Sequence, residues 1–287
     1  MRALVTGGAG FVGTNLIKKL LTDGHSVTSL DNYSTGKKEN EQEGCKYFWV
    51  DLIDTMDFSW HMKNIDVIFH LGALARIQPS LKNPAEYITN NFNSTLHVLE
   101  YARQQNIKVV YAGSSSKHHG LYESPYAWSK YGGEELCKLY SNVYGVNTAI
   151  CRFYNVYGPH HLREGAYATV IGIFEKLYMN NLPLTITSDG EQRRDFTHVD
   201  DIVDGIIKCS LQDFKGEEFE FGRGVNHSIN ELADMFGKEY DREYIPKRMG
   251  EYDITLCVDT KSKEVLGWEP SKDLQDYIIQ FKESWKK

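Results

Sequence analysis

Cysteine is scarce in this sequence, and long hydrophobic runs are lacking. The five cysteines among the 287 residues are odd in number, widely spaced and form no C-x-x-C pair. This usage is typical of reduced intracellular thiols and excludes a disulfide scaffold. No apolar run approaches the roughly 18 residues of a membrane-spanning helix, and Met1 leads almost directly into a strand pattern. We therefore expect neither a membrane span nor a signal peptide, and a cytoplasmic globular protein.

An excess of positive charge is also lacking. Lys and Arg number 32 against 39 Asp and Glu, which gives a formal net charge of −7, and no long basic run occurs. Nucleic acid and anionic membranes are therefore poor partners. The hydrophobic share of 41% and charged share of 25% exclude a disordered or fibrous chain. At about 150 residues per domain, the length allows one large or two small domains.

The first half of the chain alternates apolar runs with helical patterns. Uninterrupted apolar strands separated by helices are typical of a parallel sheet covered on both faces. We therefore predict an α/β fold, a Rossmann-type doubly wound parallel sheet with a smaller, discontinuous C-terminal substrate domain. The first domain is expected at residues 1–157, rejoined by about 196–215, and the second at 158–195 and 216–287. The predicted strands are 2–6, 26–30, 47–50, 66–71, 108–112 and 148–153, and the predicted long helices are 11–23, 85–105 and 126–144.

A glycine loop follows the first predicted strand and opens a helix. Gly7 permits a tight turn, Gly10 lets the backbone approach a pyrophosphate, and Gly13 allows the helix to pack closely on the strand. The helix N-terminus supplies free N–H groups for phosphate. An ordinary glycine turn is the alternative, but strand, loop and helix occur in the order that a dinucleotide site requires.

Asp31 ends the second predicted strand, 18 residues beyond Gly13. A carboxylate there accepts both ribose hydroxyls of adenosine and repels the 2′-phosphate of NADP. No Arg or Lys follows before Lys37, so we predict NAD as the cofactor. Asp51, after the third strand, is a weaker candidate for the edge of the adenine ring.

Tyr126 and Lys130 stand four residues apart at the start of a predicted helix, and therefore share one face. An ammonium there favours the phenolate and lowers the tyrosine pKa from about 10, and an oxidised nicotinamide adds to this effect. Such a tyrosine can exchange a proton with a sugar hydroxyl. The spacing alone is weak evidence, but it follows a dinucleotide loop and the serines 114–116, one of which should hydrogen-bond the reacting hydroxyl.

With these motifs the sequence resembles the extended short-chain dehydrogenase/reductase family. Within that family it resembles the NAD-dependent nucleotide-sugar epimerase/dehydratase group, with UDP-glucose 4-epimerase the nearest pattern. The resemblance rests on residues 6–13, 31–32, 70–74, 90–93, 152–159, 190–201 and 248–251. It implies cofactor contacts from Gly7, Gly10, Phe11, Val12, Gly13, Asp31, Asn32, Asp51, Leu52, Leu71, Ala73, Asn91, Tyr126, Lys130 and Phe153. It implies substrate contacts from Ser115, Ser116, Tyr126, Asn155, Arg194 and Arg248.

The segment after the fifth strand departs from the family pattern. Counting back from Gly120 places Ser115 at the catalytic Ser/Thr position. Sugar 4,6-dehydratases carry Asp-Glu at the next two positions, and nucleotide-sugar decarboxylases carry Glu at the second. Here these positions are Ser116 and Lys117, which argues for an epimerase.

The sequence departs from the family pattern in two other ways. Two histidines stand where the family has Val-Tyr, and the loop that follows them is short. His118 and His119 together with His160 and His161 are a conceivable metal pair, but packing or surface roles are favoured, so we expect no metal. Only five residues separate Gly120 from Tyr126, where the family usually has a longer loop. Our hypothesis is an opened hexose pocket, with relaxed specificity or a bulkier sugar.

The predicted function is NAD-dependent epimerisation of a nucleoside-diphosphate hexose, most simply a UDP-sugar. The resemblance implies transient oxidation at C4 to a 4-keto sugar by Tyr126, Lys130 and Ser115, followed by reduction from the opposite face. A dehydratase, a decarboxylase or a 4-keto-sugar reductase is the alternative on the same scaffold. A non-catalytic dinucleotide-binding regulator is disfavoured because Tyr126 and Lys130 are intact. The family also implies a homodimer formed through helices 85–105 and 126–144.

Overall fold

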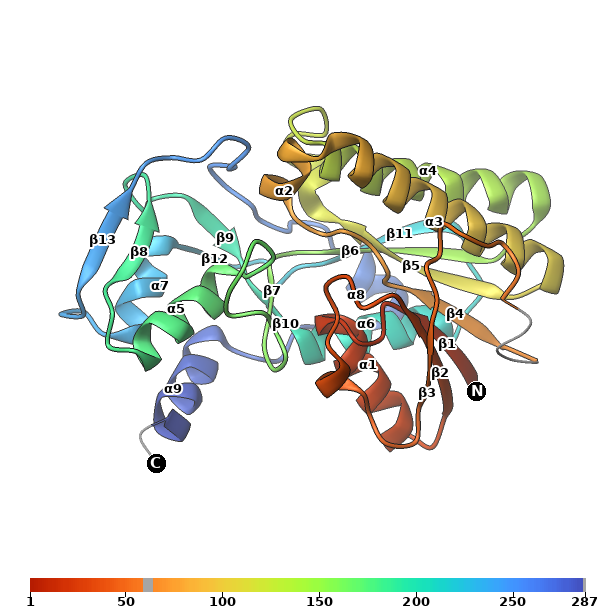
Figure 1. Cartoon of the computed structure of the whole chain (residues 1–287), viewed down its shortest axis with the longest axis horizontal. Helices are drawn as coiled ribbons and strands as arrows, with labels where there is room; N and C mark the ends of the chain where they lie inside the picture. The colour runs from red at the N-terminus through yellow and green to blue at the C-terminus, as the bar shows by residue number, and fades with distance from the viewer. Residues whose placement is uncertain (59–63, 286–287) are drawn as a thin grey trace.

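A seven-stranded, fully parallel sheet forms the centre of the molecule (Figure 1). The computed structural model describes residues 1–58 and 64–285. All six predicted strands and all three predicted long helices are present, with ends within two residues of those expected. In spatial order the strands are β11 (Lys215–Phe221), β6 (Thr148–Phe153), β5 (Lys108–Ser114), β4 (Val67–His70), β1 (Arg2–Thr6), β2 (Ser26–Asp31) and β3 (Lys46–Trp49).

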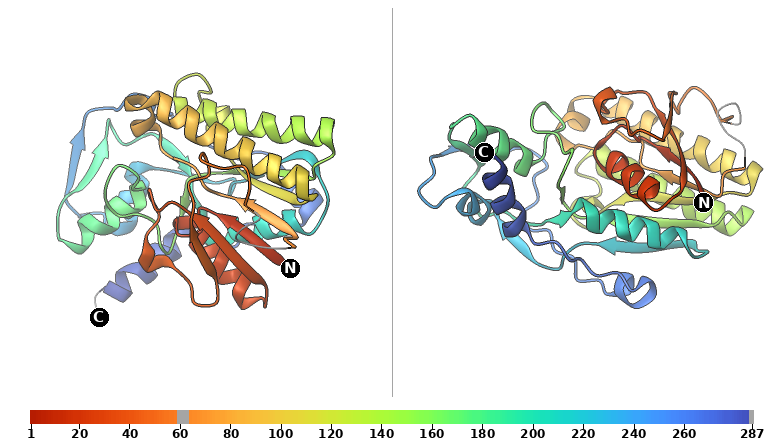
Figure 2. Two further views of the ribbon diagram at one scale, coloured as in Figure 1. Left: turned by 45° about the vertical axis from the view of Figure 1, so that its right-hand side comes forward. Right: turned by 90° about the horizontal axis from the view of Figure 1, so that it is seen from below.

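Helices cover both faces of this sheet, as Figures 1 and 2 show. Helices α1 (Phe11–Thr22) and α6 (Val199–Ser210) pack on one face. Helices α3 (Pro84–Gln105) and α4 (Pro125–Tyr144) pack on the other. The predicted doubly wound α/β class is thereby confirmed.

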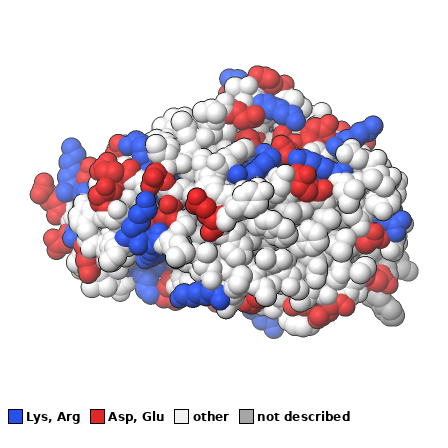
Figure 3. Space-filling model, turned by 90° about the horizontal axis from the view of Figure 1, so that it is seen from above, with Lys and Arg blue, Asp and Glu red and all other residues white. Residues whose placement is uncertain are grey.

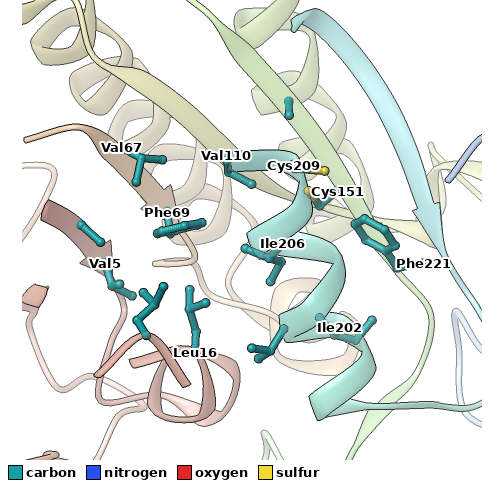
Figure 4. Close-up of a cluster of buried hydrophobic side chains, with 14 of the residues drawn as sticks. Val5, Leu16, Val67, Phe69, Val110, Cys151, Ile202, Ile206, Cys209 and Phe221 are labelled. Atoms are coloured by element: carbon teal, nitrogen blue, oxygen red, sulfur yellow. The ribbon is translucent and has the colours of Figure 1, made fainter. Parts of the chain in front are cut away.

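Successive strand residues belong to opposite layers of the core. Val5 and Phe69 point into the cluster shared with α1 and α6 (Figure 4), whereas Leu4 and Ile68 belong to the cluster shared with α3 and α4. All four side chains have no exposed surface. Burial on both faces is the reason why these strands read as continuous apolar runs.

The start of α4 is fixed by local sequence. Ser124 caps the helix by accepting a hydrogen bond from the backbone N–H of Ala127 at 3.1 Å, and Pro125 occupies the first helical position. Tyr126 therefore lies in the first turn of α4, close to where β5 ends.

The remainder of the chain forms smaller paired strands and helices around a second core. This core includes Phe174, Phe196, Leu232 and Phe236. Its elements are β7 (Val156–Tyr157) with β10 (Thr197–His198), β8 (Leu184–Thr187) with β13 (Arg242–Ile245), β9 (Arg193–Asp195) with β12 (Asn226–Ser228), α5 (Val170–Met179), α7 (Ile229–Phe236) and α9 (Leu274–Trp285). The short helices are α2 (Ile77–Lys82), α8 (Lys261–Leu266), and the 3-10 turns η1 (Lys38–Asn40) and η2 (Ser115–His118).

Two stretches that the sequence analysis assigned to the second domain pack with the first. Residues 216–221 belong to β11, which pairs with β6 in the central sheet. Leu266 and Trp268 join the core beside α6, and the Trp268 indole donates to the carbonyl of Asp201 at 2.8 Å. We propose that the first domain consists of residues 1–157 and returning segments that include α6, β11 and α8.

Among residues 1–58 and 64–285, no helix is both long enough and apolar enough to cross a lipid bilayer.

The α6 contribution to the core predicts a specific loss of stability. Ile206 has no exposed surface and faces the sheet (Figure 4). Because truncation leaves a cavity that the packed sheet cannot fill, Ile206→Ala should lower the free energy of unfolding by about 2–5 kcal/mol. The matched control is Leu211→Ala just beyond α6, where the side chain is 70% exposed, and it should change stability by under about 0.5 kcal/mol. Equilibrium denaturation measures both, and equal effects would contradict this packing.

Candidate active site

A large cavity of about 1130 Å³ opens at the carboxyl ends of the central strands. Its wall combines loops of the first domain with residues of the second, as expected for a switch-point site in a doubly wound fold. Two of the predicted residues, Asn91 and Lys130, lie behind this wall. The predicted residues that line it are Gly7, Gly10, Phe11, Val12, Gly13, Asp31, Asn32, Asp51, Leu52, Leu71, Ala73, Ser115, Ser116, Tyr126, Phe153, Asn155, Arg194 and Arg248.

The glycine loop has the geometry that the spacing predicts. Gly7 adopts a φ of +70°, and a Cβ on Gly13 would lie 2.2 Å from the carbonyl oxygen of Gly7. Side chains are therefore excluded at both positions. The first turn of α1 has no acidic residue and no side-chain cap, so its backbone N–H groups are free to bind phosphate.

Three polar side chains form the far end of the cavity. The Asp31 carboxylate accepts hydrogen bonds from the N–H groups of Ala9 at 2.9 Å and Tyr33 at 2.7 Å. Asn32 donates to Asp51 at 3.0 Å. Burial raises the pKa of Asp31, and the two N–H donors counter this shift. The nearest following cation, Lys37, is paired with Glu39 at 3.2 Å. This end therefore suits two ribose hydroxyls and disfavours a 2′-phosphate.

Tyr126 enters the middle of the cavity and contacts a serine that the sequence analysis did not select. Its hydroxyl lies 3.3 Å from Oγ of Ser114. Ser114 Oγ also accepts from the N–H of Ser116 at 3.2 Å and from its hydroxyl at 2.8 Å. Its own proton is therefore available to a phenolate. Ser115 lines the cavity as well, so its predicted contact with the substrate hydroxyl stays a prediction.

Burial dominates the ionisation of Tyr126. It raises the pKa of the phenol above about 10, although Ser114 and the Arg76 guanidinium lower it. Lys130 is not among the groups that lower this pKa. Its predicted role, to bring the phenol toward neutrality together with an oxidised nicotinamide, stays a prediction. Desolvation also lowers the pKa of Lys130, to about 8, and its Nζ lies 4.3 Å from the ring centroid of Tyr111.

Asn91 supports the cavity wall from behind. Its side chain accepts from the N–H of Leu74 at 2.8 Å and donates to the carbonyl of Leu74 and to Ser129, both at 3.0 Å. Its hydrogen-bonding capacity is thus used within the protein. Asn91 ties the segment after β4 to α4, which fits indirect support of the cofactor better than the predicted direct contact.

Two unpaired arginines and an asparagine mark the substrate side. Asn155, in β6–β7, donates to the carbonyl of Asp195 and to Thr255, each at 2.9 Å. Arg194 is largely buried, and desolvation lowers its pKa. Within the described part of the chain, neither Arg194 nor Arg248 has a carboxylate within ion-pair distance. Arg194 Nη1 donates to the uncharged carbonyl of Arg193 at 2.9 Å. Two guanidinium groups without an ion pair in one cavity suit a diphosphate, whose oxygens they can bind in pairs.

A tyrosine of the second domain packs beside the short loop that is predicted to open the hexose pocket. A Cβ on Gly120 would lie 2.9 Å from the ring of Tyr252, which also packs against His119 with ring centroids 5.7 Å apart. Tyr252 lines the cavity. A segment of the second domain thus covers part of this loop, and the hypothesis of an opened pocket stays a prediction.

Three of the four histidines that raised the question of a metal have separate hydrogen-bond partners. His118 pairs with Glu220 at 2.8 Å and His161 with Glu175 at 2.9 Å. His160 lies 3.2 Å from Asn40. Across residues 1–58 and 64–285, no group of three or more metal-ligating side chains is close enough to hold an ion.

Comparison with known families identifies the scaffold. Residues 3–222 match the NAD dependent epimerase/dehydratase family. The chain belongs to this family. The expected resemblance to extended short-chain dehydrogenase/reductases is confirmed, and the protein is an NAD-dependent enzyme of the epimerase class.

Individual relatives span the whole chain. UDP-glucose 4-epimerase of Mycolicibacterium smegmatis is 32% identical over 98% of this chain and 97% of its own. The crystal structure of Thermotoga maritima UDP-glucose 4-epimerase with UDP-glucose has a TM-score of 0.92 at 28% identity, covering 100% of both chains. UDP-N-acetylglucosamine 4-epimerase of Methanobrevibacter ruminantium, solved with UDP-N-acetylmuramic acid, has a TM-score of 0.89 at 30% identity, covering 99% of this chain and 97% of its own.

The two serines predict different kinetic phenotypes. Ser114→Ala removes the hydroxyl that can donate to the Tyr126 phenolate, so the acidic limb of the pH profile of kcat/KM should move to higher pH. Ser115→Ala should lower kcat while leaving that limb in place, because its predicted partner is the substrate. pH profiles of both variants test the assignment. An unmoved limb in Ser114→Ala, or a moved one in Ser115→Ala, would contradict it.

Proposed function

We propose that this protein is an NAD-dependent 4-epimerase of UDP-hexoses. One observation carries the proposal: the Tyr126 hydroxyl lies in a single cavity that also holds the glycine loop and the two unpaired arginines. A dinucleotide and a nucleotide sugar can therefore meet at one ionisable phenol.

The residues of the cavity fit NAD. Free amides at the start of α1, the steric demand for glycine at Gly7 and Gly13, and the Asp31 carboxylate suit its pyrophosphate and its adenosine ribose. When bound, NAD supplies a reversible two-electron acceptor beside the sugar. The other residues predicted to contact the cofactor also line the cavity: Phe11, Val12, Leu71, Ala73 and Phe153.

The chain's own residues handle the proton and the substrate. Tyr126 as phenolate takes the proton from the C4 hydroxyl and returns it after the sugar has turned over. Ser115 hydrogen-bonds that oxygen, and Arg194 and Arg248 hold the diphosphate. Asn155, also predicted to bind this group, donates to Asp195 and Thr255, so its role here is to fix these two segments beside the arginines. The reaction is redox-neutral, so it requires no second substrate.

The surroundings of Lys117 favour an epimerase over a dehydratase or a decarboxylase. Its ammonium pairs with Glu218 at 3.3 Å and lies 5.3 Å from the ring centroid of Tyr131. The Ser116 hydroxyl donates a hydrogen bond to Oγ of Ser114. The two positions that carry Asp-Glu in dehydratases thus supply no carboxylate.

We also propose a homodimer formed through α3 and α4. Figure 3 looks down on this side of the molecule and shows a broad area without charged residues on the right half. Large apolar side chains are exposed on these helices, among them Ile88, Trp128, Leu139 and Val143. Their burial between two copies would be favourable. The free cysteines agree with a cytoplasmic location.

Product analysis tests the proposed reaction. Incubation with UDP-, dTDP-, GDP- and CDP-sugars, followed by NMR, should yield the C4 epimer of a UDP-hexose without net NADH. A 4-keto-6-deoxy product would instead indicate a dehydratase, loss of CO₂ a decarboxylase, and net NADH a dehydrogenase. No turnover of any sugar nucleotide would favour a binding protein.

The variant Tyr126→Phe tests the role of the phenol. It should lose several orders of magnitude in rate while binding UDP nearly as tightly as the wild type, because only the ionisable group is removed. Mass spectrometry of freshly purified, denatured protein should also detect retained NAD, which a redox-neutral epimerase does not need to exchange.

A further inference from the structure

A third arginine lines the cavity, and the sequence analysis did not select it. Arg76 precedes α2 at its N-cap position, in the segment that follows β4. Nε donates to the carbonyl of Tyr167 at 2.8 Å, and Nη1 donates to the carbonyl of Ala75 at 3.1 Å. Both acceptors are uncharged. Throughout the described residues, no carboxylate lies within ion-pair distance of this guanidinium.

Phenols surround Arg76 instead. Tyr87, Tyr126 and Tyr167 are the ionisable groups that act on it, and the Tyr87 hydroxyl donates to that of Tyr167 at 2.9 Å. Desolvation by burial lowers the pKa of Arg76, and the three tyrosines counter this shift only in part. A desolvated, unpaired charge is costly, and an anion that enters the cavity would relieve this cost.

Arg76 lines the same cavity as Tyr126, and this shared position limits which anion it can bind. The glycine loop suits the pyrophosphate of the cofactor, and Arg194 and Arg248 suit the diphosphate of the substrate. The group near Tyr126 is the sugar ring, with C4 at the phenol. In the sugar ring C4 is bonded to C5, and C5 carries C6 outside the ring. A carboxylate at C6 therefore lies close to the reacting carbon.

We propose that Arg76 binds a C6 carboxylate, and that the preferred substrate is a UDP-hexuronic acid. A guanidinium can bind both oxygens of a carboxylate through two parallel hydrogen bonds, which a neutral C6 hydroxyl cannot accept in the same way. The proposal rests on the proposed 4-epimerase function and narrows its substrate class. Arg76 is then a specificity-determining residue for the reaction at Tyr126.

Arg76 also favours the Tyr126 phenolate, and this second effect can be separated. Its influence on the phenol acts on every substrate alike, whereas a contact with the carboxylate acts only on the uronic acid. The ratio of kcat/KM for UDP-glucuronate to that for UDP-glucose therefore isolates the contact, because the two sugars differ only at C6.

The experiment measures this ratio in the wild type, Arg76→Gln and Arg76→Lys. The wild type should prefer UDP-glucuronate and convert it to UDP-galacturonate. Arg76→Gln should lower the ratio about 10- to 150-fold, as expected for hydrogen bonds to a charged group. Arg76→Lys keeps the charge and should recover part of it. Arg103→Gln, at an exposed arginine in α3, is the matched control and should leave the ratio unchanged.

Three outcomes would overturn the proposal. A wild type that epimerises UDP-glucose in preference to UDP-glucuronate refutes it while the proposed function stands, and this result needs no variant. If Arg76→Gln lowers kcat/KM equally for both substrates, Arg76 acts only by favouring the Tyr126 phenolate and does not bind the carboxylate. A protein that binds UDP but epimerises neither sugar removes both the inference and the proposed function.

Discussion

The cost of placing a negative charge on a partly buried phenol governs this site. Tyr126, in the first turn of α4, faces residues 114–116 and the cavity, and burial raises the pKa of its phenol. The protein alone does not offset that cost, because Ser114 and Arg76 lower the pKa by less than burial raises it. We infer that the positive charge of an oxidised nicotinamide supplies the remaining stabilisation, so that the tyrosine becomes a base only when the cofactor is bound.

A buried ionic network holds residues 114–118, which include the three serines, against this phenol. Arg152 in β6 binds Glu134 of α4 at 2.7 Å and Glu220 of β11 at 2.8 Å, and Glu220 binds His118 in turn. Glu134 also accepts from the backbone N–H of Ser114 at 3.4 Å. Four separate elements are thereby fixed around the end of β5. This network explains why a histidine stands at position 118, for which the sequence pattern offers no reason.

Local patterns in the sequence predicted the sheet, the long helices and most of the cavity wall, because each depends on residues that are neighbours in the chain. Apolar runs such as residues 148–153 are visible without tertiary information. The segment 216–221 was missed as part of the sheet because Glu218 and Glu220 interrupt its apolar pattern. These two carboxylates are accommodated in β11 only because Arg152 and Lys117 face them.

Other features depend on distant contacts that no local pattern contains. Tyr252 packs beside the short loop from the second domain, and Arg76 becomes conspicuous only when the cavity shows it to be unpaired. Counting from Gly120 selected Ser115, but the 3-10 turn brings Ser114 to the phenol. The i, i+4 spacing of Tyr126 and Lys130 correctly placed both on α4, but it could not show that Lys130 is itself desolvated over Tyr111.

The ultraviolet difference titration of wild-type protein against Tyr126→Phe, between pH 6 and 10, tests the central claim most directly. Cofactor-depleted protein should show no phenolate signal from Tyr126 below about pH 10, whereas protein saturated with NAD should show a full ionisation step in this range. The same titration curve with and without NAD would contradict the account, since the nicotinamide charge would then contribute nothing to the ionisation of Tyr126.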